Sequence, residues 1–254
     1  MSMESRAAGT PGTFFGVGVG PGDPELLTVK AERLLRRVPV VCVPRGREEG
    51  ESYARSIVAH LLDPSRQEVL ELAFPMTRDR TRREAGWELA REQIVARLLA
   101  GQDVAFVTEG DPFVYSTFVD LYRLIRERHP ELPVEVVPGV SSVNAAAAAA
   151  GLPLVDGAER LAVLPASYEG EALANVLERF DAVVLLKVSP VFDRLLDTLE
   201  ALDLADRAVY VRRCGSAEQE IVRDLRGLRG KALDYLSLVI VRKQQRAEKA
   251  EGSR

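Results

Sequence analysis

The chain has 254 residues, of which 46% are hydrophobic and 28% charged, and its net charge is −4. Such a length corresponds to one or two domains, and such a composition is that of a folded globular protein. The slight negative charge argues against a protein that coats nucleic acid, and no apolar run approaches the ~18 residues of a membrane helix. Two isolated cysteines (Cys42 and Cys214) and two histidines favour neither a disulfide framework nor a metal centre. We therefore expect a cytoplasmic α/β protein without a membrane, nucleic-acid or metal partner.

Short apolar segments alternate with helical patterns along the first half of the chain. Strands are expected at residues 13–19, 38–43, 68–72, 104–108 and 134–137. Helices are expected at residues 25–37, 53–62, 82–99 and 114–128. This alternation predicts βαβ units and a largely parallel sheet, because two parallel strands need a long crossover between them.

The second half continues the α/β pattern after an alanine-rich helix that begins near Ser141 and ends at Gly151. Strands are expected at residues 161–164, 182–188, 208–212 and 236–242, and helices at residues 171–180 and 191–202. Residues 218–228 are compatible with a strand followed by a turn, and their structure stays open. We expect two α/β domains, at residues 13–140 and 141–245, with flexible tails at residues 1–12 and 246–254. Residues 1–12 lack the apolar segment that a secretory signal requires.

The first motif, FGVGVGPGDP at residues 15–24, is a predicted strand that runs into a glycine-rich turn. Glycines allow the backbone to approach a ligand closely and to offer it N–H groups. The motif is not a dinucleotide-binding G-x-G-x-x-G, because Pro21 and Asp23 stand where the third glycine is required. The acid that would hold a ribose at the end of the second strand is also absent, and no P-loop lysine follows. The alternatives are a ligand site built from backbone and a tight turn in which Asp23 caps a helix starting at Pro24.

Two further motifs also begin where a predicted strand ends. TEGDPFVYST occupies residues 108–117, and VPGVSSVN occupies residues 137–144. Because ligands of open parallel sheets bind beyond the carboxyl ends of the strands, turns at several such ends can face one crevice. Asp111 could accept hydrogen bonds from a ligand, or cap a helix whose first residue is Pro112, and the two roles can coexist. For the third motif, the alternative is a serine-capped helix packed through its small residues.

These three motifs, in this order, resemble those of the tetrapyrrole (class III) S-adenosylmethionine-dependent methyltransferases, over about residues 13–243. The segments GVGVGPGDPELLTVKA, EGDPFVYST and PGVSS carry the resemblance. Within the family, the chain is most similar to the branch that methylates C-20 of precorrin-2 in cobalamin biosynthesis. The residues that point to this branch are GDP followed by YSTF at residues 110–118, FPMT at residues 74–77 and VLLK at residues 184–187.

The resemblance implies a fold of two α/β domains, with a mostly parallel first sheet and a mixed second sheet. It also implies that S-adenosylmethionine binds in a cleft between the domains, largely through backbone groups. The implied cofactor contacts in the first domain are Pro21, Gly110, Asp111, Val114, Ser116, Thr117, Ser141 and Ser142. Those in the second domain are Lys187, Arg213, Cys214, Ser237 and Leu238. Several relatives have an apolar residue at the position of Lys187. The alternative to a cofactor contact is that Lys187 is an ordinary lysine at the end of a strand, paired at the surface.

The implied substrate is a reduced tetrapyrrole that carries many carboxylates and an electron-rich meso carbon. Positioning matters more in such a methyl transfer than a nucleophilic side chain, but a base must take the proton from the methylated carbon. The candidates for this base are Glu109, Asp111 and Tyr115. Carboxylates favour cationic donors, and the candidates for substrate binding are Gly20, Arg45, Arg78, Arg80 and Arg213. The alternative for the arginines after residue 77 is a solvated helix face on which Glu84 and Glu88 pair with them.

Other functions stay open beside methyl transfer to C-20. They are methylation at a different tetrapyrrole position, an NAD-type oxidoreductase and a non-catalytic module that senses the cofactor. The motifs do not distinguish a metal-free ring from a ring that carries cobalt. The resemblance also implies a homodimer.

Overall fold

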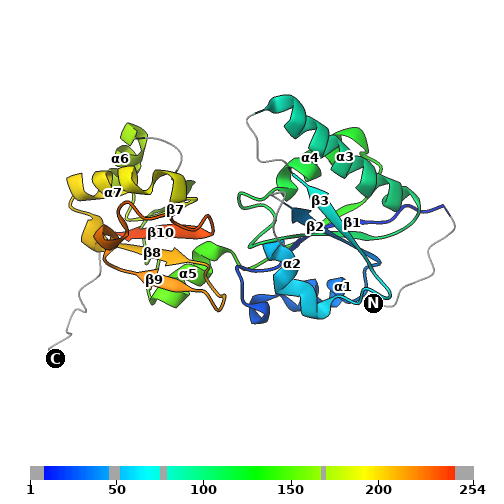
Figure 1. Cartoon of the computed structure of the whole chain (residues 1–254), viewed down its shortest axis with the longest axis horizontal. Helices are drawn as coiled ribbons and strands as arrows, with labels where there is room; N and C mark the ends of the chain where they lie inside the picture. The colour runs from blue at the N-terminus through cyan, green and yellow to red at the C-terminus, as the bar shows by residue number, and fades with distance from the viewer. Residues whose placement is uncertain (1–8, 46–51, 75–78, 167–169, 244–254) are drawn as a thin grey trace. The chain divides into compact units, whose positions relative to one another are not determined.

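The computed structural model describes residues 9–45, 52–74, 79–166 and 170–243. The chain divides into two compact units, Met1–Ser142 and Val143–Arg254, and each is described by itself. Both are α/β units, drawn in Figure 1. In the described part of the chain, no helix combines the length and the hydropathy that crossing a membrane requires.

The first unit is built on a parallel five-stranded sheet, which confirms the sequence prediction. Its strands lie in the order β3-β2-β4-β1-β5, and every neighbouring pair is parallel. The strands are β1 (Phe14–Gly18), β2 (Val40–Arg45), β3 (Glu68–Ala73), β4 (Val104–Thr108) and β5 (Val134–Val137). Because all five run in one direction, the turns that follow β1, β4 and β5 leave the same edge of the sheet.

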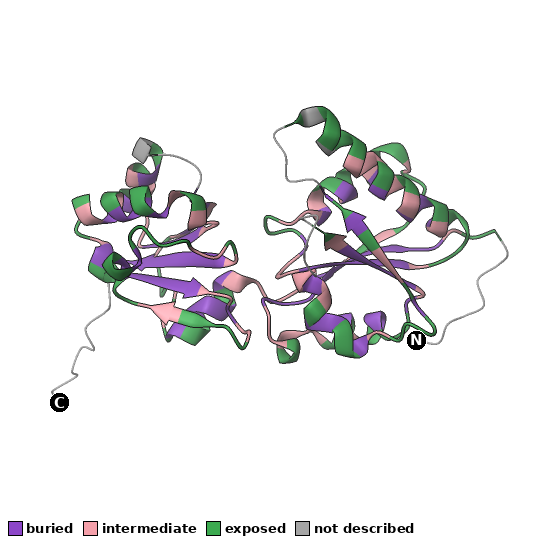
Figure 2. Cartoon of the chain, in the orientation of Figure 1, coloured by how far each residue is buried: buried purple, intermediate pink, exposed green. Residues whose placement is uncertain are grey.

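Helices cover both faces of this sheet (Figure 1). On one face lie α1 (Val29–Leu35) and α2 (Tyr53–Val58), and on the other α3 (Arg80–Leu99) and α4 (Phe118–Arg128). The central strands β1 and β4 are buried throughout, as Figure 2 shows by colour. Such continuous apolar strands are typical of a sheet that is covered on both sides.

The helices of the first unit begin or divide at places that the sequence pattern did not predict. The helix expected at residues 53–62 is α2 followed by η2 (Ala59–Leu61), and the helix expected from residue 82 begins at Arg80. The helix expected at residues 25–37 is instead η1 (Pro24–Leu26) followed by α1, because the Thr28 side chain accepts the Ala31 N–H and starts a new helix. Asp23 caps the helix that starts at Pro24, one of the alternatives for this turn, by accepting the Glu25 N–H over 2.8 Å. The helix expected from residue 114 begins four residues later, at Phe118. The expected tail at residues 1–12 lies outside the described residues except for its end, where the Gly12 N–H donates to the Leu98 carbonyl over 2.7 Å.

The second unit begins with α5 (Ser142–Ala150), whose first residue still belongs to the first unit, and contains a mixed sheet, as expected. Its strands lie in the order β6-β7-β10-β8-β9, with β6 parallel to β7 and β10 antiparallel to both its neighbours. The strands are β6 (Leu161–Pro165), β7 (Ala182–Leu186), β8 (Ala208–Arg212), β9 (Glu220–Val222) and β10 (Ser237–Arg242). The segment left open at residues 218–228 forms β9 and the short helix η5 (Leu225–Leu228).

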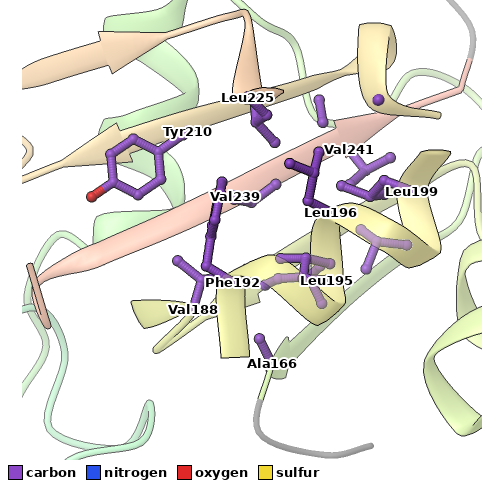
Figure 3. Packing of buried hydrophobic residues seen from close by; sticks show 14 of the residues in the cluster. Ala166, Val188, Phe192, Leu195, Leu196, Leu199, Tyr210, Leu225, Val239 and Val241 are labelled. Carbon is purple, nitrogen blue, oxygen red and sulfur yellow. The ribbon is translucent and has the colours of Figure 1, made fainter. Parts of the chain in front are cut away.

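One core holds this second sheet to its helices α6 (Gly170–Arg179) and α7 (Phe192–Ala201). Figure 3 shows side chains of α7, such as Phe192 and Leu196, packed against Tyr210 of β8 and Val239 of β10. The rings of Phe192 and Tyr210 meet edge to face, with their centroids 6.0 Å apart. The core fixes the positions of β7, β8 and β10, and therefore of the residues at their ends.

Candidate functional site

The turns after β1 and β4 are joined by their backbones at the carboxyl edge of the first sheet. Gly110 donates its N–H to the Gly20 carbonyl over 2.8 Å, and the two residues form an isolated antiparallel bridge. One step earlier, the Val19 N–H donates to the Thr108 carbonyl over 3.0 Å. The first and second motifs therefore meet directly, as the shared strand direction predicts.

The third motif reaches the same point, and glycines make the approach possible. A Cβ atom on Gly18 would lie 2.6 Å from both the Gly110 oxygen and the Gly139 nitrogen. A Cβ atom on Gly139 would lie 2.1 Å from the Gly110 oxygen. Real side chains do not tolerate such distances, so the three turns can pack only through backbone. The result is a cradle lined by main-chain atoms at the edge of the sheet.

Asp111 ties the second turn to the third. One carboxylate oxygen accepts the Phe113 N–H over 2.9 Å, and the other accepts the Gly139 N–H over 3.1 Å. Of the two roles considered for Asp111, that of a cap for a helix starting at Pro112 is wrong, since α4 starts only at Phe118 and Asp111 closes a turn within its own segment. Both oxygens of Asp111 are engaged by the protein itself, which makes this residue a structural support of the cradle.

Ser116 caps the start of α4 through its hydroxyl. Its hydroxyl lies 2.8 Å from the Thr108 hydroxyl and accepts the Phe118 N–H, the first of α4, over 3.1 Å. Thr117 occupies the residue before the helix but makes no capping hydrogen bond with its side chain. Between Asp111 and Ser116, an exposed loop carries Phe113, Val114 and Tyr115.

Tyr115 has a φ of +53°, which is uncommon for a residue with a bulky side chain. Only three other non-glycine residues of the described chain share a positive φ, namely Lys187, Asp203 and Arg213. Strained backbone of this kind persists only where the surrounding structure enforces it, and it is enriched at functional sites. Three of the four positions were singled out from sequence as site residues.

Glu109 lies between the second turn and the start of α2. Its carboxylate accepts hydrogen bonds from its own N–H and from that of Ala54 in the first turn of α2. Burial is the dominant influence and raises the pKa of the Glu109 carboxyl above its usual value, although these N–H groups favour the charged form. The neighbouring residue in α2, Tyr53, donates its hydroxyl to the Pro21 carbonyl over 3.2 Å. The start of α2 thereby contacts both the first and the second motif.

Ser141 and Ser142 lie where the third motif enters α5 (Ser142–Ala150). Both are half-buried. A Cβ atom on Gly110 would be 3.8 Å from the Ser141 Cα and from the Ser142 nitrogen. The structure therefore places these serines beside the second turn, as expected of residues that line one site.

The candidate residues of the second unit lie at one edge of its sheet. Since β7 and β8 are both antiparallel to β10, they end at the edge where β10 begins. Lys187 follows β7 with a φ of +57°, and Arg213 follows β8 with a φ of +43°. Ser237 and Leu238 open β10, opposite the ends of β8 and β7. Strand β7 ends at Leu186, two residues earlier than expected, because the left-handed residue Lys187 interrupts it.

Arg213 is held by carboxylates of its own unit. Its Nε lies 2.6 Å from Asp234 Oδ2, and its Nη1 lies 3.1 Å from the Glu218 carboxylate. Burial favours the neutral form of Asp234, but hydrogen bonds from Arg213 and the Leu236 N–H outweigh it, so the pKa of this carboxyl lies below its usual range. Cys214 beside it is buried, and burial raises the pKa of its thiol.

Of the remaining arginine candidates, the structure describes the side chain of Arg45 only. Arg45, at the end of β2, is exposed and lies 3.6 Å from the Glu71 carboxylate. Arg78 lies outside the described residues, as does the side chain of Arg80. Glu88 contacts Arg91 at 2.8 Å and Arg128 at 3.6 Å. The alternative in which Glu84 and Glu88 pair with the first arginines of α3 stays a prediction, because the side chains of Arg80 and Arg83 lie outside the described residues.

The sequence interpretation missed Tyr53, Ala54 and Asp234. For Asp234, a local signal existed, because its carboxylate accepts the N–H of the residue two positions later, Leu236, over 2.8 Å. This arrangement is common for aspartate in turns. The contact of Tyr53 with Pro21 joins residues 32 positions apart and carries no local signal.

Fold and site together define an α/β protein in which three glycine-containing turns pack through backbone at the carboxyl edge of a parallel sheet. The chain belongs to the tetrapyrrole (corrin/porphyrin) methylase family, whose sequence profile matches residues 13–228. This confirms the resemblance seen in the three motifs, and it favours methyl transfer over the NAD-type oxidoreductase.

Two relatives cover almost the whole chain. A probable cobalt-precorrin-2 C(20)-methyltransferase of Methanocaldococcus jannaschii is 35% identical over 233 residues, which are 91% of this chain and 96% of that protein. A precorrin-2 C(20)-methyltransferase of Sinorhizobium sp is 34% identical over 240 residues, which are 91% of this chain and 95% of that protein. The uroporphyrin-III C-methyltransferase of Thermus thermophilus, solved with S-adenosylhomocysteine, matches with a TM-score of 0.66 and 26% identity over 91% of this chain and 98% of its own.

The described residues contain no group of three His, Cys, Asp or Glu side chains that could hold a metal ion. The two curated relatives, one named for a cobalt-bearing substrate and one for a metal-free substrate, are almost equally similar to this chain. Sequence identity alone therefore does not show whether the ring substrate of this protein carries cobalt.

Proposed function

We propose that this protein transfers a methyl group from S-adenosylmethionine to C-20 of precorrin-2, either metal-free or carrying cobalt, in cobalamin biosynthesis. The observation that carries the proposal is the packing of Gly18, Gly110 and Gly139 into one backbone cradle. It stands in a chain that aligns with relatives named for this reaction over nine-tenths of its length.

The cradle fits a cofactor that is bound mainly through main-chain groups. Bound there, S-adenosylmethionine supplies a methyl group on a positively charged sulfur, which an electron-rich carbon can attack. Pro21, Gly110 and Val114 would contact it from the first two turns, and Ser141 and Ser142 from the third. Asp111 would act by holding the turns together, since both its oxygens already accept backbone N–H groups. Holding the reacting partners in line supplies much of the rate enhancement in such a transfer.

The same proposal gives roles to the second unit. Its candidate contacts, Lys187, Arg213, Cys214, Ser237 and Leu238, come from three strand ends at one edge of its sheet. Lys187 brings positive charge to that edge, which suits the carboxylates of a tetrapyrrole, whereas the charge of Arg213 is already balanced by Asp234 and Glu218. The structure holds Arg213 between Asp234 and Glu218, so its guanidinium is oriented before any ligand arrives.

The predictions of a homodimer and of a cytoplasmic location belong to the same proposal. The dimer is tested by sedimentation of the purified protein over a tenfold range of concentration. Any cobalt would enter with the ring, because the described residues provide no metal-binding group.

The test is an anaerobic incubation of the purified protein with methyl-labelled S-adenosylmethionine and, separately, precorrin-2 or its cobalt-bound counterpart. Carbon NMR and mass spectrometry report how many methyl groups arrive and at which carbon. One label at C-20 supports the proposal, and the preferred ring identifies the substrate. A label at another carbon, or no transfer while S-adenosylhomocysteine still binds in calorimetry, overturns the C-20 assignment but keeps the family.

A further inference from the structure

We infer that Tyr115 is a substrate-contacting residue whose aromatic ring packs against a face of the tetrapyrrole, and that its strained backbone is retained for this contact. The inference rests on the proposed function and deepens it. It concerns the loop at residues 113–115, which lies between the hydrogen bonds of Asp111 and those of Ser116 at the carboxyl edge of the first sheet.

The loop exposes three large apolar side chains in succession, those of Phe113, Val114 and Tyr115. In the described part of the chain, no other exposed apolar side chain of this size adjoins a second one in the sequence. Single exposed apolar residues need no explanation, whereas contiguous exposed apolar surface marks interaction sites. The loop also lies beside the cradle, because Asp111, which precedes it, binds the Gly139 N–H at 3.1 Å.

The conformation of the loop is fixed at both ends. At its start, the Phe113 N–H donates to the Asp111 carboxylate over 2.9 Å, and the Val114 N–H donates to the Asp111 carbonyl over 3.2 Å. At its end, the Ser116 hydroxyl accepts the first N–H of α4 over 3.1 Å. Tyr115 joins the two fixed ends, so its backbone has little freedom to relax.

Tyr115 makes this connection with a φ of +53°. Glycine adopts this left-handed conformation without strain and asparagine tolerates it, whereas a bulky side chain is strained by it. The turn by itself therefore does not require a tyrosine. The tyrosine side chain is 47% exposed, so packing within the first unit uses only part of its surface. Strained backbone is enriched where a side chain contacts a ligand, and the exposed part of this ring is available to one.

The tetrapyrrole is the ligand that fits this loop best. In the proposed function, the cofactor is bound mainly through backbone groups of the cradle. The substrate instead has broad apolar ring faces, with its carboxylates at the rim. Aromatic side chains pack well on the faces of conjugated rings and lose little conformational freedom in doing so. Tyr115, beside Phe113, thus offers the substrate a rigid apolar surface next to the place where the methyl group is supplied.

The experiment separates substrate contact from folding and from cofactor binding. Anaerobic calorimetry measures the Kd of S-adenosylhomocysteine and then, in its presence, the Kd of the ring that the wild type methylates, metal-free or carrying cobalt. The variants are Tyr115→Gly, Tyr115→Asn and Tyr115→Phe. Asp203→Gly is the matched control, because Asp203 is exposed, has a φ of +54° and belongs to no candidate site.

Tyr115→Gly and Tyr115→Asn should weaken ring binding about 3- to 10-fold, as expected for loss of an aromatic contact, and leave S-adenosylhomocysteine binding unchanged. Their Tm should equal or exceed that of wild type, because the left-handed backbone is no longer strained. Tyr115→Phe keeps the aromatic ring and should bind the tetrapyrrole like wild type. Asp203→Gly should also equal or exceed the wild-type Tm, and it should bind both ligands like wild type.

Several outcomes would overturn the inference. They are unchanged ring binding in Tyr115→Gly and Tyr115→Asn, an equal loss of S-adenosylhomocysteine binding, and a lower Tm in both variants, which would give the side chain a structural role. Weak ring binding by Tyr115→Phe would assign the contact to the hydroxyl, and a change in the sedimentation of Tyr115→Gly would assign the loop to a contact between subunits. If the wild type methylates neither ring, the proposed function fails, and this inference with it.

Discussion

The carboxylate of Asp111 accepts the backbone N–H of Gly139 across 28 positions of sequence, at 3.1 Å. With its other oxygen on the Phe113 N–H, this side chain joins the turn after β4 to the turn after β5. Gly139 in turn packs against the Gly110 oxygen, which no residue with a Cβ atom could approach as closely. The cradle at the carboxyl edge of the first sheet therefore depends on one side chain and three glycines.

Asp111→Ala should weaken both the fold of the first unit and its binding of the cofactor. Loss of the charged acceptor leaves the part-buried Gly139 N–H without its partner, at about 1–3 kcal/mol, whereas the exposed Phe113 N–H can bond to water. Thermal unfolding and calorimetric titration with S-adenosylhomocysteine measure the two effects. Asp120→Ala, at an exposed position on α4, is the control and should change the binding constant less than twofold. Wild-type affinity in Asp111→Ala would contradict the assigned role.

Gly139→Ala should abolish detectable cofactor binding. The added Cβ atom would lie 2.1 Å from the Gly110 oxygen and 2.8 Å from the Gly18 Cα, so the turns must separate. The same substitution at Gly227, where no atom lies within 4 Å of the added carbon, is the matched control. We expect Gly227→Ala to bind S-adenosylhomocysteine like wild type and to change stability by no more than about 0.5 kcal/mol. Equal binding by both variants would show that the cradle is not the cofactor site.

Glu109→Gln should stabilise the ligand-free protein at neutral pH. The folded-state pKa of Glu109 is raised by burial, so the native state opposes ionisation and loses stability as pH rises above the ordinary glutamate pKa of about 4.3. A glutamine cannot ionise and escapes this loss. The difference in Tm should therefore be positive at pH 7 and shrink as pH falls through the folded-state pKa, whereas Glu135→Gln, at an exposed position on β5, should leave Tm unchanged. A lower Tm for Glu109→Gln at pH 7 would contradict the buried position.

Asp234→Asn should have the opposite pH dependence. The folded-state pKa of Asp234 is below its usual range, so its charged form stabilises the second unit above the ordinary aspartate pKa of about 3.9. That contribution is lost as pH falls through the folded-state pKa. Unfolding of wild type and Asp234→Asn should thus differ most at pH 7, with the variant less stable, and converge in acid. Glu178→Gln, exposed on α6, is the control. A constant difference across the pH range would show that the Arg213–Asp234 pair is not responsible.

The sequence by itself determined the order and type of most strands and longer helices, although residues 218–228, which form β9 and η5, stayed open. Apolar runs of strand length and helical periodicity are local properties, so β4 and β8 match the expected residues 104–108 and 208–212. Three motifs at strand ends were also sufficient to indicate the family, because each has an uncommon composition over about ten residues. The parallel sheet followed from the same alternation.

Only the tertiary structure decided which backbone and side-chain groups meet. Whether Gly18, Gly110 and Gly139 touch depends on the strand order β3-β2-β4-β1-β5, which places β1 between β4 and β5. The start of α4 at Phe118 depends on a hydroxyl that is also held by Thr108 of the neighbouring strand. The support that Asp111 gives to the cradle comes from its contact with Gly139. The contacts among the glycines and that of Asp111 with Gly139 join segments far apart in sequence, which the packing of the sheet brings together and which no local pattern encodes.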